Sequence, residues 1–382
     1  MMRTPADGPQ AITPNRDPVV WLILSEKTGD NAQLLALAEA LPWPSLTKRV
    51  EVQEPYRLGK PRVTASLHHI DPGRSDALQP PWPDLVIAVG RRMSMVALWI
   101  QSQAGGHPRL VLLGAPRRFA NRFDLAVVSE QYRQGHRSNE MRITYPLQRI
   151  DEAGITAEAE ARRDEFAKFA HPKIAVLVGG ATKAVRFDAA VAARLARDVA
   201  ELARNEQGSL LVTTSRRTPP EVVEVLARDL PAGAMLHRWS EGSARNPYRA
   251  LLGLADRFVV TSDSLSMMME IARLGRPLAI YPLPESSGLA WIPLVARSTV
   301  ARRLAAIGQH RDLTAIPKAL VRDGFAVWFG ERFRSAGRRP PDQLAEVAER
   351  IVGLMQRQPR EERPAPLTAR ICTAIGAAAH RS

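Results

Sequence analysis

The residues best suited to chemistry lie in and after a short polar run, TSDS at 261–264. The stretch that follows, 265–272, is apolar except at Ser266 and Glu270. With Asp263 as the N-cap of a helix, these three polar residues share one helix face. A nearly all-apolar helix is buried, and a buried carboxylate needs hydrogen-bond donors. We therefore expect Glu270 to accept hydrogen bonds from a sugar or ribose diol, with phosphate at the helix N-terminus.

Two other loops that follow apolar runs carry groups that suit an anion. Residues 179–183, GGATK, combine a glycine turn with a hydroxyl and an ammonium. Their spacing is that of neither a Walker A loop nor a dinucleotide-binding fingerprint, so a tight turn is the alternative interpretation. Residues 213–218, TTSRRT, place Arg216 and Arg217 just before a helix that we expect to begin with the last threonine as its N-cap. These arginines are suited to clamping phosphate; the alternatives are solvated loop arginines or an ion pair with Glu270.

The elements that must position these loops are short, continuous apolar runs, which are typical of buried parallel strands. The runs alternate with helix patterns, and this alternation predicts parallel sheets with helices on both faces. Ligands bind beyond the carboxyl ends of the strands in such sheets. The expected strands are 19–24, 85–89, 110–113, 125–128, 174–178, 210–213, 258–260 and 278–281, and the expected ligand loops are 25–30, 90–92, 114–118, 179–186, 214–218 and 261–266.

The chain has 382 residues, which is enough for two domains. We expect two doubly wound α/β domains with a cleft between them. The expected segments are a disordered lead-in (1–17), an N-terminal Rossmann-like domain (18–150), a helical connector (151–172), a C-terminal Rossmann-like domain (173–340), a C-terminal helix (341–357) and a loose basic tail (358–382).

Composition narrows the class of ligand and the compartment. The single cysteine, Cys372, excludes an intramolecular disulfide and a cysteine-rich zinc site, and the eight histidines show no metal-ligand spacing. A formal net charge of +14 with only 5% aromatic residues favours anionic ligands or an anionic membrane surface over nucleic acid. We find neither an apolar run of about 18 residues nor a signal-peptide pattern, so we expect a cytoplasmic protein, peripheral at the inner membrane.

Several motifs together resemble the mitochondrial-fission ELM family, whose bacterial members are often described as glycosyltransferases or as nucleoside-diphosphate-sugar epimerase-like proteins. The resemblance spans about residues 20–355, in the family's order. It rests on SEKTGDNAQ at 25–33, PDLVI and GRR within 83–92, VGG at 178–180, TTSRRTP at 213–219, NPY at 246–248 and VTSDSLSM at 260–267. A wider resemblance is to GT-B enzymes such as the N-acetylglucosaminyltransferase of peptidoglycan synthesis and lipid A disaccharide synthase. It implies a GT-B-like fold of two doubly wound Rossmann-like domains, the C-terminal one holding a nucleotide sugar.

The resemblance also implies roles for single residues. Glu270 would bind the ribose hydroxyls, and the first loop, with Lys27 and Gly29, would face the acceptor. Apart from the resemblance, we expect Asp30 or Glu26 to act as the base. The family pattern has a histidine after the glycine of the first loop, where this chain has Asp30. The nucleotide- or sugar-binding candidates are Gly179, Gly180, Thr182, Lys183, Ser215, Arg216, Arg217, Ser262, Asp263, Ser264, Ser266 and Glu270. The acceptor-side candidates are Lys27, Gly29, Arg91 and Arg92.

The predicted function is transfer of a sugar from a nucleotide-diphosphate sugar to a membrane-attached glycan or lipid, with neither a metal nor a further cofactor. Lys183, Arg216 and Arg217 would stabilise the departing diphosphate. Two alternatives stay open. One is a nucleotide-sugar epimerase on the same fold. The other is a non-catalytic scaffold, because the plant members of the family are known as fission factors on the mitochondrial surface.

Overall fold

The computed structural model describes residues 16–57, 61–115, 119–130, 132, 137–182, 185–242, 245–285 and 314–357. The expected loose ends, up to residue 15 and from residue 358, lie outside the described residues, as does Lys183. The chain divides into two compact units, residues 1–126 with 345–382, and residues 127–344. Among the described residues, no helix has both the length and the apolar character that crossing a bilayer requires.

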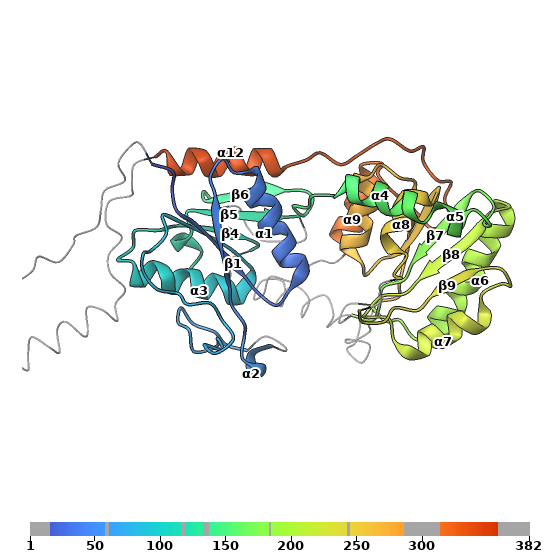
Figure 1. Cartoon of the computed structure of the whole chain (residues 1–382), viewed down its shortest axis with the longest axis horizontal. Helices are drawn as coiled ribbons and strands as arrows, with labels where there is room; N and C mark the ends of the chain where they lie inside the picture. The colour runs from blue at the N-terminus through green and yellow to red at the C-terminus, as the bar shows by residue number, and fades with distance from the viewer. Residues whose placement is uncertain are drawn as a thin grey trace, which may run out of the picture. The chain divides into compact units, whose positions relative to one another are not determined.

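The first sheet has six strands, which form around continuous apolar runs. All residues of β1, β3 and β5 are buried. The strand order is β2 (Ser45–Arg49), β1 (Val20–Leu24), β3 (Leu85–Val89), β4 (Arg109–Leu113), β5 (Leu125–Ser129) and β6 (Glu140–Ile143). The pairs β2–β1, β1–β3 and β3–β4 are parallel. The helices of this part are α1 (Thr28–Ala40), α2 (Glu54–Arg57), α3 (Gly90–Gln103) and the 3-10 turn η1 (Ala120–Arg122) (Figure 1).

The second sheet also has six strands, and every neighbouring pair in it is parallel. Its order is β12 (Val327–Trp328), β11 (Leu278–Tyr281), β10 (Arg257–Thr261), β7 (Lys173–Leu177), β8 (Ser209–Thr213) and β9 (Met235–His237). The helices that follow β6 along the chain are α4 (Glu152–Ala161), α5 (Arg163–Phe166), α6 (Ala189–Asn205), α7 (Pro220–Asp229), α8 (Tyr248–Leu254), α9 (Leu265–Arg273), α11 (Ala315–Arg322) and α12 (Leu344–Met355).

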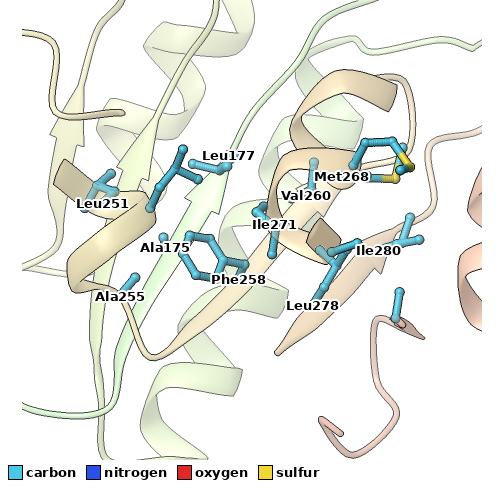
Figure 2. Close-up of a cluster of buried hydrophobic side chains, with 14 of the residues drawn as sticks. Ala175, Leu177, Leu251, Ala255, Phe258, Val260, Met268, Ile271, Leu278 and Ile280 are labelled. Carbon is cyan, nitrogen blue, oxygen red and sulfur yellow. The ribbon is translucent and has the colours of Figure 1, made fainter. Parts of the chain in front are cut away.

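Alternate residues of the second sheet enter two separate cores, because successive side chains of a strand point to opposite faces. On one face, Phe258 and Val260 of β10 pack with α8, α9 and α11. Figure 2 shows this core, with Met268 and Ile271 of α9 lying over the strands. On the other face, Val259 of β10 packs with α6 and α7. The sheet is therefore covered by helices on both sides, and the expected pair of doubly wound parallel-sheet domains is confirmed.

An aspartate stands directly before three of the central strands and holds the start of the neighbouring strand at two points. Asp84, before β3, accepts a hydrogen bond from Val19 N–H at 2.8 Å and returns one from its own N–H to the Val19 carbonyl at 2.8 Å. Asp124, before β5, makes the same pair of bonds with Leu110 of β4, at 2.8 and 2.9 Å. Asp256 and Lys173 repeat it between β10 and β7, at 2.6 and 2.9 Å.

Three expected helix starts are wrong: those with Thr218 and Asp263 as N-caps, and a third that the sequence predicts at Asp30, with Gln33 three residues on as a capping box. Asp30 is not an N-cap: α1 begins at Thr28, with Lys27 as N-cap, so Asp30 lies inside the first turn. Helix α7 begins at Pro220 with Pro219 as N-cap. The hydroxyl of Thr218, which the pattern assigned to capping, is instead bonded to the neighbouring loops.

Candidate functional site

The loops that follow β7, β8 and β10 are joined by hydrogen bonds at the carboxyl edge of the second sheet. Gly179 N–H donates to Thr261 Oγ1 at 2.8 Å, and Gly180 N–H donates to Asp263 Oδ2 at 2.9 Å. Thr218 Oγ1 donates to the Gly179 carbonyl at 2.5 Å. Because parallel strands end at the same edge, three stretches far apart in the sequence form one connected surface here.

Asp263 is the centre of this network. Its Oδ1 accepts from Thr261 Oγ1 at 2.7 Å, and its Oδ2 accepts from Arg217 Nη2 at 2.8 Å and from Ser264 Oγ at 3.1 Å. The side chain is fully buried, whereas 45% of the Arg217 side chain is exposed. A buried carboxylate needs such partners. The ion pair that the sequence suggested for Glu270 is therefore made by Asp263, and the assumption that Asp263 is an N-cap is wrong.

Both glycines of the turn after β7 are required by the close approach of these loops. A Cβ on Gly179 would overlap the side chains of Asp263 and Ser264. A Cβ on Gly180 would overlap the backbone of Arg217. The glycine pair thus lets the three loops meet, which a tight turn alone would not require.

The loop after β8 is ordered by its own hydroxyl groups. Thr218 Oγ1 accepts from Ser215 N–H at 2.9 Å, and Ser215 Oγ accepts from Arg217 N–H at 3.4 Å. Arg216 is exposed and has no partner among the residues that the structure describes. The two adjacent arginines therefore differ: Arg217 is held toward Asp263, and Arg216 faces solvent.

Helix α9 begins beside this ion pair. Its N-cap residue is Ser264, whose side chain makes no capping bond to the helix. The Ser264 hydroxyl instead accepts from Arg217 Nη2 at 3.2 Å. Ser266, in the first turn, is exposed. The Asp263 carboxylate offsets part of the Arg217 charge, and the first turn of α9 adds the positive end of a helix dipole, which favours an anion.

Glu270 lies one and a half turns further along α9 and is bonded to neutral donors. Gln148 Nε2 donates to Oε1 at 3.1 Å, and the Tyr248 hydroxyl donates to Oε2. Burial raises the pKa of Glu270, and the bonds from Tyr248 and Gln148 offset part of this rise. Burial and the adjacent carboxylate also raise the pKa of Tyr248 well above its usual value. Glu270 makes no contact with Arg216 or Arg217 among the described residues.

A cavity of about 450 Å³ opens beside the end of β9. It is lined by Met235, Leu236 and His237 of that strand, by Arg162, Glu165 and Arg245, and by Pro247. The carbonyl of His237 accepts from Thr214 N–H at 3.0 Å, in the loop that carries Arg217. Pro247 immediately precedes Tyr248, the partner of Glu270. Backbone contacts therefore link the cavity to the loop that carries Arg217 and to Tyr248, which bonds Glu270.

Other predicted residues have structural contacts. Ser262 Oγ accepts from Leu283 N–H at 3.0 Å, and Thr182 Oγ1 accepts from Val185 N–H at 3.2 Å. These two hydroxyls fasten the loops after β10 and β7. Among the described residues, no group of three or more histidine, cysteine or acidic side chains is arranged to hold a metal ion.

In the first sheet, the acidic candidates lie in the loop after β1 and in the first turn of α1. Asp30 Oδ2 is 3.8 Å from Lys27 Nζ and also 3.8 Å from where a Cβ on Gly90 would lie, so its carboxylate lies near the turn that starts α3. Glu26 and Gly29 are exposed. Neighbouring strands β1 and β3 thus bring these residues to one edge of their sheet.

Arg91 and Arg92, in the first turn of α3, hold the backbone of a nearby loop. Arg91 Nη1 donates to the Pro61 carbonyl at 2.5 Å, and Arg92 Nη2 donates to the Arg57 carbonyl at 2.6 Å. Their expected role toward an acceptor stays a prediction.

Sequence reasoning missed the residues that hold Glu270. Gln148 is 122 residues away along the chain, and nothing in its local sequence marks it. Tyr248 could have been found, because it belongs to the NPY motif at 246–248, but its role was not assigned.

Comparison with known proteins identifies the family of this chain. The curated Mitochondrial fission protein ELM1 of Arabidopsis thaliana is 29% identical over 220 residues, which are 52% of this chain and 51% of that protein. The chain therefore spans about half the length of that relative. An uncharacterized protein of Rickettsia prowazekii (strain Madrid E) is 26% identical over 303 residues, 71% of this chain and 85% of that one. Among solved structures, UDP-GlcNAc 2-epimerase from Methanocaldococcus jannaschii is 12% identical with a TM-score of 0.47, over 87% of this chain and 99% of that one. Residues 28–355 match the family described as Mitochondrial fission ELM1, and the chain belongs to that family.

Proposed function

We propose that this chain binds a nucleoside-diphosphate sugar at the carboxyl edge of the second sheet and transfers the sugar to an acceptor. The observation that carries the proposal is the order of groups along α9, from its N-terminal turn to Glu270. Its first turn has no side-chain cap and lies beside the Arg217 guanidinium, and Glu270 follows on the same helix. From Leu265 to Glu270 the helix rises about 7.5 Å. An anion-binding end and a carboxylate thus lie about as far apart as the diphosphate and the ribose of one nucleotide.

The charge of the departing diphosphate would be stabilised by groups that are already in place. Arg217 is fixed by Asp263 and Ser264, so it needs little reorganisation when charge develops. Arg216 is exposed next to it and is free to make a charge-assisted hydrogen bond to phosphate. The formal net charge of +14 favours an acceptor that is attached to an anionic membrane.

Room for the rest of a nucleotide supports the same proposal. The cavity beside β9 has a volume of about 450 Å³, within the range of small-molecule sites. Its lining combines the apolar Met235 and Leu236 with the charged Arg162, Glu165 and Arg245, and Arg162 is itself paired with Glu165. We propose that the base of the nucleotide occupies it, since Pro247 and Tyr248 connect the cavity to Glu270.

For the transfer step, Asp30 and Glu26 are the proposed bases. Both lie at or just after the end of β1, at the carboxyl edge of the first sheet. Asp30 is only partly exposed and is paired with Lys27. The lysine would keep the carboxylate oriented, and an acceptor hydroxyl that approaches it would lose its proton as the new glycosidic bond forms.

A second candidate function is nucleotide binding without turnover. It is favoured by one observation: the carboxylates of Asp263 and Glu270 are both already bonded to groups of the protein. Such a protein would use the ligand to stabilise a conformation rather than to react with it.

The test of the proposal is ligand-dependent stabilisation. We expect a uridine, guanosine or adenosine diphosphate sugar to raise the melting temperature of the full chain, and Glu270→Ala to abolish the rise. The matched control is Glu201→Ala, which changes an exposed glutamate on α6, a helix that packs on the same sheet. This variant should keep the rise in melting temperature. No rise with any of these sugars would overturn the proposal. Release of nucleoside diphosphate with an acceptor separates transfer from binding alone, and NMR detection of an epimerised sugar without an acceptor would identify an epimerase instead.

A further inference from the structure

Three segments that are distant in the sequence converge on the carboxylate of Glu270. Tyr248 is the first residue of α8, Gln148 lies between β6 and α4, and Glu270 is on α9. The phenol hydroxyl bonds one carboxylate oxygen and the amide bonds the other, at 3.1 Å. Each oxygen therefore has one donor from the protein, and the rotation of the carboxylate is fixed.

Both donors are neutral. No ion pair reaches Glu270 within 4 Å among the described residues. The other buried acidic centre of the same edge, Asp263, is paired directly with Arg217 at 2.8 Å. Hydrogen bonds from neutral donors favour the ionised carboxylate without adding a positive charge, whereas the guanidinium beside Asp263 adds one. The remaining lone pairs of Glu270 can therefore form strong bonds to the hydroxyl groups of a ligand.

Two other tyrosines of the same unit show that a phenol–carboxylate bond is also used for structure alone. Tyr281 donates to Asp198 Oδ2 at 2.7 Å, and Tyr145 donates to Asp323 Oδ2 at 2.7 Å. Asp323 is also bonded to Arg322 Nε at 2.7 Å, whereas neither Asp198 nor Glu270 has an ion pair within 4 Å among the described residues. The Tyr248–Glu270 pair differs from both in its second neutral donor, Gln148 Nε2, at 3.1 Å. Arg249 acts on Glu270 only as a nearby charge.

We propose that Tyr248 and Gln148 are positioning residues that hold the Glu270 carboxylate ionised and correctly rotated for the ribose diol of the ligand. This inference rests on the proposed function. Tyr248 stays a neutral donor because its pKa is far above neutrality. Its hydrogen bond, with that of Gln148, favours the ionised form of a carboxyl group whose pKa is raised by burial.

The test compares two tyrosine-to-phenylalanine changes. Tyr248→Phe removes only the hydroxyl that bonds Glu270. Tyr281→Phe removes the equivalent hydroxyl that bonds Asp198, and it is the matched control. Gln148→Leu serves as a second variant if Tyr248→Phe does not fold. Calorimetry measures the affinity for whichever of uridine, guanosine or adenosine diphosphate binds the wild type. Carbon-13 NMR of glutamate-labelled protein follows the titration of the Glu270 carboxyl group directly.

We expect Tyr248→Phe to weaken nucleoside diphosphate binding about tenfold at neutral pH, the usual effect of losing a hydrogen bond to a charged group. Its Glu270 should titrate at a higher pH than in the wild type, and Tyr281→Phe should change neither property. In a Glu270→Gln background, Tyr248→Phe should cause no further loss, because its effect passes through the carboxylate.

Unchanged affinity and an unchanged Glu270 titration in Tyr248→Phe would overturn the inference, as would an equal loss in Tyr281→Phe. A wild type that binds none of the three diphosphates overturns the proposed function instead. In that case the NMR titration alone decides whether Tyr248 controls the ionisation of Glu270.

Discussion

Arg217 Nη2 lies 2.8 Å from Asp263 Oδ2, so the loop after β8 and the loop after β10 are joined by an ion pair with one buried and one exposed partner. The pairing has two effects. It gives a charged partner to a carboxylate whose side chain is fully buried. It also holds a guanidinium beside the first turn of α9, where an anionic ligand would meet it.

Removing Asp263, the buried partner of this ion pair, should destabilise the protein. We expect Asp263→Ala to lower the free energy of unfolding by about 3 kcal/mol, because Gly180 N–H and the Thr261 hydroxyl lose their acceptor. Asp188→Ala removes the N-cap of α6 and should cost only about 1 kcal/mol. Urea denaturation followed by circular dichroism measures both values. An equal cost for the two changes would contradict the central role of Asp263.

The glycine turn gives a steric prediction. Gly179→Ala should lower the midpoint of urea denaturation, because the new methyl group overlaps Asp263 and Ser264. Gly353, in α12, has open space around its Cα, so Gly353→Ala should stabilise the protein by about 0.5–1 kcal/mol. A Gly179→Ala protein as stable as the wild type would show that the three loops are further apart than described.

Glu270 should make the ligand-free protein less stable at neutral pH. Because its pKa is raised by burial, the folded state binds a proton more tightly than the unfolded chain. Its contribution to stability is thus full below about pH 4.3, the unfolded value, and is lost as pH rises through the folded pKa.

We therefore expect Glu270→Gln to match the wild type near pH 4 and to exceed it at pH 7, while losing ligand affinity. Urea midpoints at pH 4, 5.5 and 7 test this expectation. A variant less stable than the wild type at pH 7 would show that Glu270 is a structural residue.

Asp84, unlike Glu270, should stabilise the protein at neutral pH and lose this effect in acid. Burial alone would raise its pKa, but hydrogen bonds from His107 and Val19 N–H, with the charge of Arg16, hold the pKa below its usual range. This stabilisation is full above about pH 3.9 and is lost as pH falls through the folded pKa.

Asp84→Asn should therefore be less stable than the wild type at pH 7, by about 1–3 kcal/mol, and the gap should narrow on acidification. Denaturation curves between pH 3 and 7 measure the gap. A gap that widens in acid would contradict the assigned contacts.

The sequence predicted the centres of both sheets better than their edges. β1 and β10 are continuous apolar runs, because a strand covered on both faces has no polar side. β2, with the sequence SLTKR, was missed because it is an edge strand whose residues are mostly exposed. β6, β9 and β12 were missed for the related reason that short or mixed strands leave no long apolar run.

The candidate site was predicted in part. The need of Glu270 for hydrogen-bond donors followed from its apolar helix, but the donors found are Tyr248 and Gln148 of the protein itself. Local spacing cannot reveal contacts between segments that only the folded chain brings together. The helix starts failed for the same reason, because Asp263 and Thr218 bond to other loops rather than to their own helices.

The aspartates before β3, β5 and β10 have a consequence for how the sheets assemble. Parallel neighbours are joined by long crossovers, so no tight hairpin turn dictates how far one strand slides along the next. A slip by one residue would send every core side chain to the wrong face. Each of these aspartates bonds the N–H and the carbonyl of one residue: Leu110 and Lys173 lie within the adjoining strand, and Val19 lies directly before it. These bonds fix the register at the start of each strand. A strand that pairs in another register during folding leaves a carboxylate and an amide N–H without partners.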